Sequence, residues 1–307
     1  MEGFISGPVS DTVAIRVAAR SENSDKGWQK SVSRPGDRLG KKDKLAGRAI
    51  IDWTPTEDLS VEFGASYWRD RSDTVAGQAV AFNPDNAAFA APGVAASVRT
   101  NWKAGQADWT PENKAIRPDY KVDSRFYSVM LRADYNVSDA ITLTSLTGYN
   151  DVRRNDMNDA DGTPIEVSEY QSDGRVKSFS QELRLTGDGD GYNWIFGGYY
   201  SKDKIRDDQV GIYGESSILN TLAFLGQRVP QTTYTAAQIA NGFNRFRNTT
   251  SQESRAMSVF ANGEYEISET VKLGAGLRYT DDNLDFAGCS RDYNNNTAPV
   301  WNTGVAA

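Results

Sequence analysis

Seven aromatic and cationic residues in two early polar stretches of the sequence could together form a ligand-binding surface. They are Trp28, Trp102, Trp109, Tyr120, Arg99, Lys103 and Arg117. Planar rings beside cations can stack on a sugar, or hold an anionic iron chelate through charge and cation–π contacts. The same side chains could instead pack a long loop against itself. Either interpretation needs a scaffold that brings these segments to one end of the molecule.

The sequence shows no arrangement typical of catalysis. It contains no histidine, the commonest general base and metal ligand. The single cysteine, Cys289, lies in the polar run CSRDYNNN, without the spacing of a metal site or a redox pair. It could bond to a cysteine beyond Ala307 or remain a free thiol. We therefore expect a protein that is not an enzyme and carries no cofactor.

The run NDMNDADGT, residues 155–163, is the one candidate for a cation site. Its acids Asp156, Asp159 and Asp161, followed by Gly162, miss the spacing of an EF-hand loop by one residue. We therefore favour a solvated loop over a metal site.

Composition limits the class of protein and its partners. The 307 residues carry a net charge of −7, which argues against a nucleic-acid partner. Mean hydropathy is −0.59, and no apolar run approaches the roughly 18 residues of a transmembrane helix. A membrane-spanning β-barrel is compatible with this hydropathy, because only every second residue of its strands faces lipid.

The clearest structural signal is a strict alternation in Ser254–Asp281. Met257, Val259 and Ala261 share one face of the first arm, and Leu273 and Leu277 share the corresponding face of the second. Such alternation predicts an antiparallel hairpin around a four-residue turn at Glu266–Glu269. Arms of about ten residues with one apolar face suit a membrane-spanning barrel better than a soluble sheet.

Related turns recur along the chain, in PVSDTVAI, TPTEDLSV, NVSDAITL and EISETVKL, with a glycine-rich variant in GDGDG at residues 187–191. The candidate strands around them are Glu2–Ile5 (a partial strand), Asp11–Arg20, Leu45–Trp53, Leu59–Asp70, Arg125–Tyr135, Ala140–Asn150, Ser178–Thr186, Tyr192–Lys202, Ser254–Tyr265 and Thr270–Asp281.

The other connections are long and polar: Ser21–Lys44, Arg71–Ser124, Asp151–Lys177, Asp203–Glu253 and the tail after Asp282. We expect a short helix at Thr232–Phe243 in one of them. Short turns at one end and long loops at the other are typical of outer-membrane barrels.

Ring and charge positions along the strands fit the same architecture. Trp53, Tyr135, Trp194 and Tyr265 lie beside short turns, and Tyr67, Tyr149, Tyr200 and Tyr279 lie towards the long loops, as in two aromatic girdles. Ten charges fall on the opposite face and would line the lumen as cross-strand pairs: Arg16, Arg48, Asp52, Glu62, Arg132, Asp134, Glu182, Arg184, Glu264 and Arg278.

Several segments resemble the barrel domain of TonB-dependent outer-membrane receptors. They are FSQELRLTG (residues 179–187), YNWIFGGYYSKDK (192–204), SVFANGEYEISETVKLGAGLRYTDD (258–282) and ISGPVSDTVAIRVAARSENSDKGW (5–28). The resemblance implies a 22-stranded barrel with an N-terminal plug, located in the cell outer membrane of a Gram-negative bacterium. It also implies energised uptake of a scarce nutrient, such as an iron–siderophore chelate or an oligosaccharide.

The resemblance further implies partners: outer-membrane lipid and lipopolysaccharide, a plug domain, TonB and a small-molecule substrate. Residues 1–307 lack the plug and its coupling box and contain about ten strands. We therefore expect the whole of 1–307 to be an all-β, antiparallel, partial barrel, ending in a loop after Gly288 and unable to transport alone. A passive porin or structural barrel, or a soluble β-rich binding domain, are the alternatives.

Overall fold

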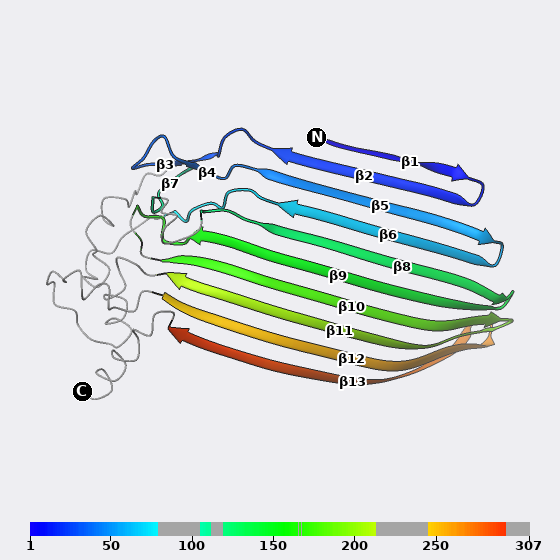
Figure 1. Ribbon diagram of the computed structural model, residues 1–307. Helices are drawn as coiled ribbons and strands as arrows, with labels where there is room; N and C mark the ends of the chain where they lie inside the picture. The colour runs from blue at the N-terminus through cyan, green and yellow to red at the C-terminus, as the bar shows by residue number, and fades with distance from the viewer. Residues whose placement is uncertain (79–104, 112–118, 165, 167, 213–244, 293–307) are drawn as a thin grey trace, which may run out of the picture.

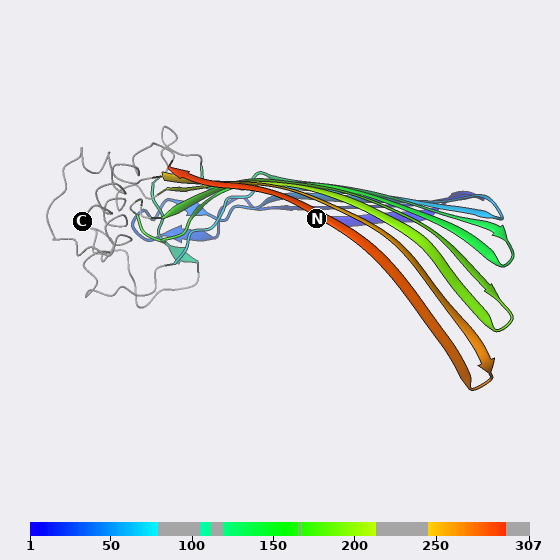
Figure 2. The ribbon, with the colours of Figure 1, turned by 90° about the horizontal axis from the view of Figure 1, so that it is seen from below.

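The computed structural model describes residues 1–78, 105–111, 119–164, 166, 168–212 and 245–292. Within these ranges, ten long strands form one antiparallel sheet in which each strand pairs with the next long strand along the chain (Figure 1). In order across the sheet they are β1 (Glu2–Ser10), β2 (Val13–Asn23), β5 (Asp43–Thr56), β6 (Leu59–Asp70), β8 (Ser124–Ser138), β9 (Ile141–Asp159), β10 (Glu169–Gly189), β11 (Tyr192–Ile212), β12 (Arg245–Ser268) and β13 (Val271–Asp292). The sheet is a single curved layer (Figure 2). The predicted all-β antiparallel fold is confirmed.

Three short strands form a second, small sheet beside the loop end of the large one. They are β3 (Gln29–Ser31), β4 (Arg38–Leu39) and β7 (Gln106–Ala107), in the order β4-β3-β7. In the part of the chain that the structure describes, no helix is long and apolar enough to cross a membrane. The helix predicted at Thr232–Phe243 lies outside the described residues.

All five short turns lie at the same end of the sheet, as predicted (Figure 1). Each has two residues between its strands, for example Asp11 and Thr12 between β1 and β2. The repeated serine shapes three of them. The backbone N–H of Thr12 donates to Ser10 Oγ at 3.3 Å. The backbone N–H groups of Ala140 and Thr270 donate in the same way to Ser138 Oγ and Ser268 Oγ, both at 3.4 Å. A register shift precedes each of these turns, as between Glu266 and Ser268. The four-residue turn predicted at Glu266–Glu269 is therefore wrong, because strand pairing continues through the bulge.

The strands on the loop side are longer than predicted. β10, β11, β12 and β13 contain 21, 21, 24 and 22 residues, against arms of about ten. The predicted loop Asp151–Lys177 is therefore largely strand, and the chain continues in β13 past Gly288 to Asp292. Apolar alternation ends where the sheet leaves the apolar band, but backbone pairing does not need it.

The extension of β9 also corrects the prediction for residues 155–163. Asn155–Asp159 belongs to a strand instead of a solvated loop, and Asp156 and Asp159 are buried. Among the described residues, no group of three or more His, Cys, Asp or Glu side chains is placed to hold a metal ion.

The buried apolar residues of the described chain lie at the loop end, away from the middle of the sheet. They are Leu39, Ala76, Ala107, Trp109, Tyr120, Met157 and Ile212. The sheet itself leaves large apolar side chains exposed along β1 to β13. A surface of this kind is stable only when another apolar medium or partner covers it.

Candidate functional site

The two faces of the sheet differ sharply in polarity. Directly paired residues share a face, so the register identifies each row of neighbours. One such row across seven strands is Leu59, Tyr135, Leu143, Leu185, Phe196, Ala261 and Leu277. The row beside it on the opposite face is Ser60, Asp134, Thr144, Arg184, Gly197, Phe260 and Arg278. The facing predicted from alternation in the C-terminal hairpin is confirmed, and it holds across the sheet.

Aromatic residues, with a methionine in the place of one ring, bound the apolar face on both sides. We call the row nearer the loops the loop-side girdle: Tyr67, Tyr127, Tyr149, Phe179, Tyr200, Met257 and Tyr279. Trp53, Tyr135, Trp194 and Tyr265 bound the face on the turn side. Eight residues separate Tyr127 from Tyr135 and Met257 from Tyr265, or about 27 Å along a strand.

The loop-side girdle crosses the strands obliquely. Followed from strand to strand, the register partner of Tyr67 on β13 is Asp285, six residues beyond Tyr279. Six residues span about 20 Å, and six strand spacings span about 29 Å. The girdle is level in a membrane if the strands tilt by about 35°, within the range of transmembrane barrels.

A polar group of three side chains interrupts the apolar face: Ser145 lies near its middle, and Thr147 and Gln181 lie two residues from the loop-side girdle. Thr147 Oγ1 lies 2.5 Å from Gln181 Oε1, and Gln181 Nε2 donates to Ser145 Oγ at 3.0 Å. These side chains satisfy one another, which lowers the cost of placing them on an apolar surface.

The polar face carries paired charges and a shallow depression. Arg132 pairs with Asp134 at 2.6 Å and Arg184 with Glu182 at 3.2 Å. Both pairs join residues i and i+2 of a single strand, so the prediction of cross-strand pairing is wrong for them. Alternation places two such residues on the same face and within reach.

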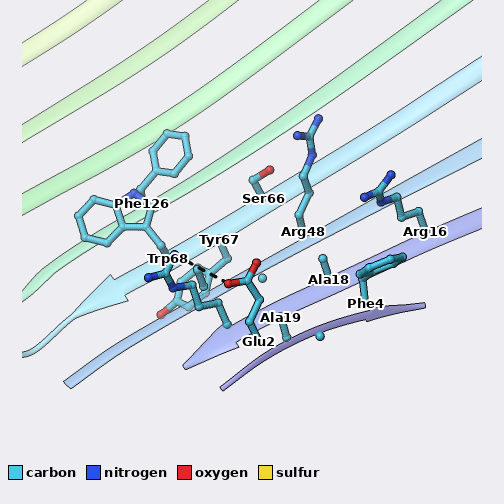
Figure 3. Close-up of a pocket in the computed structure, with 14 residues that line it drawn as sticks. Glu2, Phe4, Arg16, Ala18, Ala19, Arg48, Ser66, Tyr67, Trp68 and Phe126 are labelled. Atoms are coloured by element: carbon cyan, nitrogen blue, oxygen red, sulfur yellow. Dashed lines mark ion pairs between the residues drawn. The ribbon is translucent and has the colours of Figure 1, made fainter. Parts of the chain in front are cut away.

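The depression has a volume of about 330 Å³ and lies beside the first strands (Figure 3). Its lining includes Phe4, Arg16, Arg48, Ser66, Trp68 and Phe126. The Arg16 guanidinium lies 5.2 Å from the centroid of the Phe4 ring. It therefore presents rings and cations together on the polar face.

At the loop end, two of the predicted aromatic residues are buried in a packed base. Trp109 is 2% exposed and Tyr120 is 1% exposed. Arg34 lies 5.7 Å from the Trp109 ring centroid and donates to its carbonyl oxygen at 2.6 Å. Tyr120 Oη donates to Glu169 Oε1 at 2.6 Å. In this structure both rings pack the loop base and present almost no surface to solvent.

A carboxylate and an amide connect the small sheet to its neighbours. Asp108 Oδ1 accepts from the Ser31 and Ser33 hydroxyls, both at 2.8 Å, and from the Ser33 backbone N–H at 3.0 Å. Gln29 donates to the Ala76 carbonyl and accepts from its N–H. Sequence reasoning missed this network, because its partners lie 47 to 77 residues apart.

Asp159 is buried in the same loop base. Its carboxylate accepts from the backbone N–H groups of Gly162 and Thr110. Burial, and then the nearby charge of Asp161, raise its pKa to about 8. The base thus has an ionisable group that titrates near neutral pH.

Trp28 is the predicted aromatic residue that the described structure leaves open to solvent. Its side chain is 54% exposed, and its ring lies over Gly40 and Gly105. A Cβ at Gly40 would lie 2.4 Å from Trp28 Nε1, and both glycines have φ of 80°. Two glycines are therefore needed to seat this ring.

The remaining predicted site residues are Trp102, Arg99, Lys103 and Arg117, which lie outside the described residues. The structure thus brings Trp28, Trp109 and Tyr120 to the same end of the sheet and leaves the other four unplaced. Cys289 is a free, exposed thiol in β13 among the described residues.

Solved structures provide the decisive comparison. No family model and no curated protein match the chain. The ferric yersiniabactin uptake receptor FyuA of Yersinia pestis matches 94% of this chain at a TM-score of 0.59 and 14% identity. FpvA of Pseudomonas aeruginosa, solved with bound pyoverdines, matches 95% at 0.60 and 12% identity. The ferric-catecholate import receptor Fiu of Escherichia coli K12 matches 93% at 0.54 and 11% identity.

These solved proteins are TonB-dependent receptors. The chain has the fold of a segment of a TonB-dependent receptor barrel. It spans 36–43% of the length of these three receptors. The chain therefore has the fold of part of the barrel wall of these receptors, with its turns at one rim and the packed loop base at the other.

Proposed function

We propose that the chain forms part of the barrel of a TonB-dependent receptor in the outer membrane of a Gram-negative bacterium. The observation that carries the proposal is the apolar face bounded by two oblique girdles, opposite a polar, charged face. A soluble binding domain would leave that apolar face exposed to water. In a bilayer it would contact lipid, and the polar face would line the lumen.

The proposed receptor takes up a small molecule, such as an iron–siderophore chelate or a related anionic chelate, with an oligosaccharide as the other substrate class. Trp28 supplies an exposed ring at the loop rim, and the exposed cations Lys26, Lys30 and Arg38 lie on the same segments. Rings beside cations bind sugars by stacking and anions by charge. Trp109 and Tyr120 would support this surface from below.

The proposed function includes the partners that uptake requires. A plug domain would contact the charged polar face, including the depression near Arg16 and Arg48. TonB would provide the energy through that plug. The lipid of the outer membrane would cover the apolar face.

Uptake assays in a strain that lacks the gene for this protein test the proposal. Radiolabelled ferric chelates and oligosaccharides are supplied at low concentration, with and without TonB. We expect restored uptake of one substrate class only when both the intact receptor and TonB are present. Uptake that persists without TonB would indicate a passive porin and would overturn the proposal.

The Trp28→Ala and Trp28→Phe variants test the binding surface. Loss of the ring should weaken substrate binding, and phenylalanine should restore part of it, because a ring can still stack. Equal affinity in all three proteins would remove Trp28 from the site. Gly36→Ala is the matched control at the same rim, since nothing lies within 4 Å of a Cβ there.

A further inference from the structure

The Trp28 ring packs against backbone from two segments that lie far apart in the sequence. Trp28 and Gly40 belong to residues 24–42, which join β2 to β5 and which we call the first rim segment. Gly105 belongs to residues 105–111, which lie between β6 and β8 and which we call the second rim segment. A Cβ on Gly105 would lie 3.3 Å from the Trp28 carbonyl oxygen and 3.6 Å from its ring atom Cε3. The seat of the ring therefore depends on how the two segments are held together.

A short parallel ladder joins the two rim segments beside the ring. Strands β3 and β7 pair in parallel over two residues each. The backbone N–H of Lys30 donates to the Gly105 carbonyl oxygen at 2.7 Å, and that of Val32 donates to the Ala107 carbonyl oxygen at 2.9 Å. Because so short a pair of strands is at best marginally stable alone, other contacts must fix its register.

The carboxylate of Asp108 supplies that contact at the far end of the ladder. Its Oδ1 accepts four hydrogen bonds from the first rim segment. The donors are Ser31 Oγ at 2.8 Å, the Val32 N–H at 3.2 Å, the Ser33 N–H at 3.0 Å and Ser33 Oγ at 2.8 Å. Asp108 is only 3% exposed, and hydrogen bonds to a carboxylate are stronger than those between neutral groups.

The Asp108 contact and the Trp28 ring flank the same ladder. Asp108 follows Gly105 by three residues, and Ser31 follows Trp28 by three residues. Since parallel strands run in the same direction, the register fixed at Asp108 is also the register at which Gly105 meets Trp28. A slip of one residue would replace Gly105, which has a φ of 80°, by a residue that carries a side chain. The ring would then lose its seat.

Other contacts tie both rim segments to the large sheet. The Gln29 side chain donates to the carbonyl oxygen of Ala76 at 3.0 Å and accepts from the Ala76 N–H at 2.8 Å. In the same connection between β6 and β8, Thr74 Oγ1 donates to the carbonyl oxygen of Met157 in β9 at 2.7 Å. The exposed ring of Trp28 therefore rests on a support that is already hydrogen-bonded to the barrel wall.

We propose that Asp108 is a positioning residue for the substrate-binding surface around Trp28, and that the two rim segments form one preformed unit. The inference rests on the proposed function, which places substrate at Trp28. A preformed surface binds without the free-energy cost of ordering its groups. Loss of the Asp108 contact would lower the fraction of receptors whose ring is correctly seated, and the apparent affinity falls by the same fraction.

The sign of the effect separates positioning from simple electrostatics. The first rim segment carries the exposed cations Lys26, Lys30 and Arg38. Removing the negative charge of Asp108 would, by charge alone, strengthen the binding of an anionic ligand to these cations. Loss of positioning predicts the opposite result, which is weaker binding.

A double-mutant cycle on the intact, detergent-solubilised receptor tests the link between Asp108 and the ring. The probe is a ferric tris-catecholate chelate, an anion that carries flat rings. Trp28→Ala should weaken its binding by about tenfold. Asp108→Ala should weaken it by about three- to tenfold, because it can remove no more than the contribution of the ring. In the Trp28→Ala background, Asp108→Ala should cost less than about twofold further.

Fluorine NMR of the receptor labelled with 5-fluorotryptophan gives a second readout that needs no ligand. The Trp28 resonance is the one that disappears in Trp28→Phe. Asp108→Ala should move this resonance to the position of solvent-exposed fluorotryptophan, and Asp108→Asn, which keeps the accepting oxygen, should leave it in place. Asp37→Ala is the matched control, because it removes an exposed acid of the same segment that pairs with Arg34 at 2.6 Å. It should also leave the resonance in place.

Three results would overturn the proposal: an unchanged Trp28 resonance in Asp108→Ala, the same displacement in Asp37→Ala, or additive losses of affinity in the double variant. Tighter chelate binding by Asp108→Ala would also overturn it, since charge would then outweigh positioning. Equal affinity of the wild type and Trp28→Ala would instead count against the binding surface of the proposed function. The Trp28 resonance would still decide the role of Asp108, so the two failures are distinguishable.

Discussion

An arginine at Phe63 tests the assignment of the apolar face to lipid. Phe63 lies in β6, four residues from Tyr67 and four from Leu59, whose direct partner is the girdle residue Tyr135. Four residues span about 13 Å, or about 10 Å of depth at the strand tilt of a barrel. Phe63 therefore lies at the middle of the apolar band, and its paired neighbours Ile51 and Leu131 are apolar.

A charged side chain at the midplane on the lipid side costs about 2–4 kcal/mol, and near an interface about 0–1 kcal/mol. Phe63→Arg should therefore lower the free energy of unfolding by about 2–4 kcal/mol relative to Phe63→Ala. Leu59→Arg, at the edge of the same face, should lower it by about 0–1 kcal/mol relative to Leu59→Ala.

Gly64→Arg is the control for the opposite face. A Cβ there meets Met130 alone, its flexible Cε at 3.4 Å and its Cβ at 4.0 Å, so a side chain can enter the lumen. We expect a smaller cost than at Phe63. The assay is urea-induced unfolding of the intact receptor in lipid vesicles, followed by tryptophan fluorescence. Equal costs at Phe63 and Gly64, or a larger cost at Leu59 than at Phe63, would refute the assignment of the faces.

Three further outcomes concern the loop rim. Gly40→Ala should displace the Trp28 ring, because its Cβ would lie 2.4 Å from Nε1 at a φ of 80°; substrate affinity should fall while barrel unfolding stays unchanged. Tyr120→Phe should destabilise the loop base by about 1–3 kcal/mol, since a buried donor to Glu169 is lost, and hydrogen exchange should speed up there and not in the sheet. Because the pKa of Asp159 is raised to about 8, the folded base binds a proton more tightly than the unfolded chain. The stability of the loop base should be highest at acidic pH and fall as pH rises through 8. Amide hydrogen-exchange protection of the base that stays unchanged between pH 6 and pH 9, after correction for intrinsic exchange, would contradict this reasoning.

The sequence was sufficient to predict the ten long strands, the shared end of the sheet at which the short turns lie and the facing of the strands. These features depend on local signals: Ser10, Ser138 and Ser268 mark turns, and alternation assigns Leu273 and Leu277 to one face.

The loop side could not be predicted in the same way. Beyond the girdle both faces of the sheet are polar, so hydropathy no longer shows where β10 or β13 ends. Trp109 and Trp28 look alike in sequence, yet one is buried and the other exposed. Their difference depends on long-range contacts such as that of Asp108 with Ser31, which no local pattern records.

The central claim, that the sheet is the wall of an outer-membrane barrel with its loop rim outside the cell, has one direct test. Cys289→Ser removes the native thiol from the intact receptor, and single cysteines then replace Lys26 at the loop rim or Asp139 at a turn. Intact cells are treated with a membrane-impermeant maleimide. We predict labelling of K26C in intact cells and of D139C only after the outer membrane is permeabilised. Labelling of D139C in intact cells, or equal labelling of both positions before permeabilisation, would contradict the account.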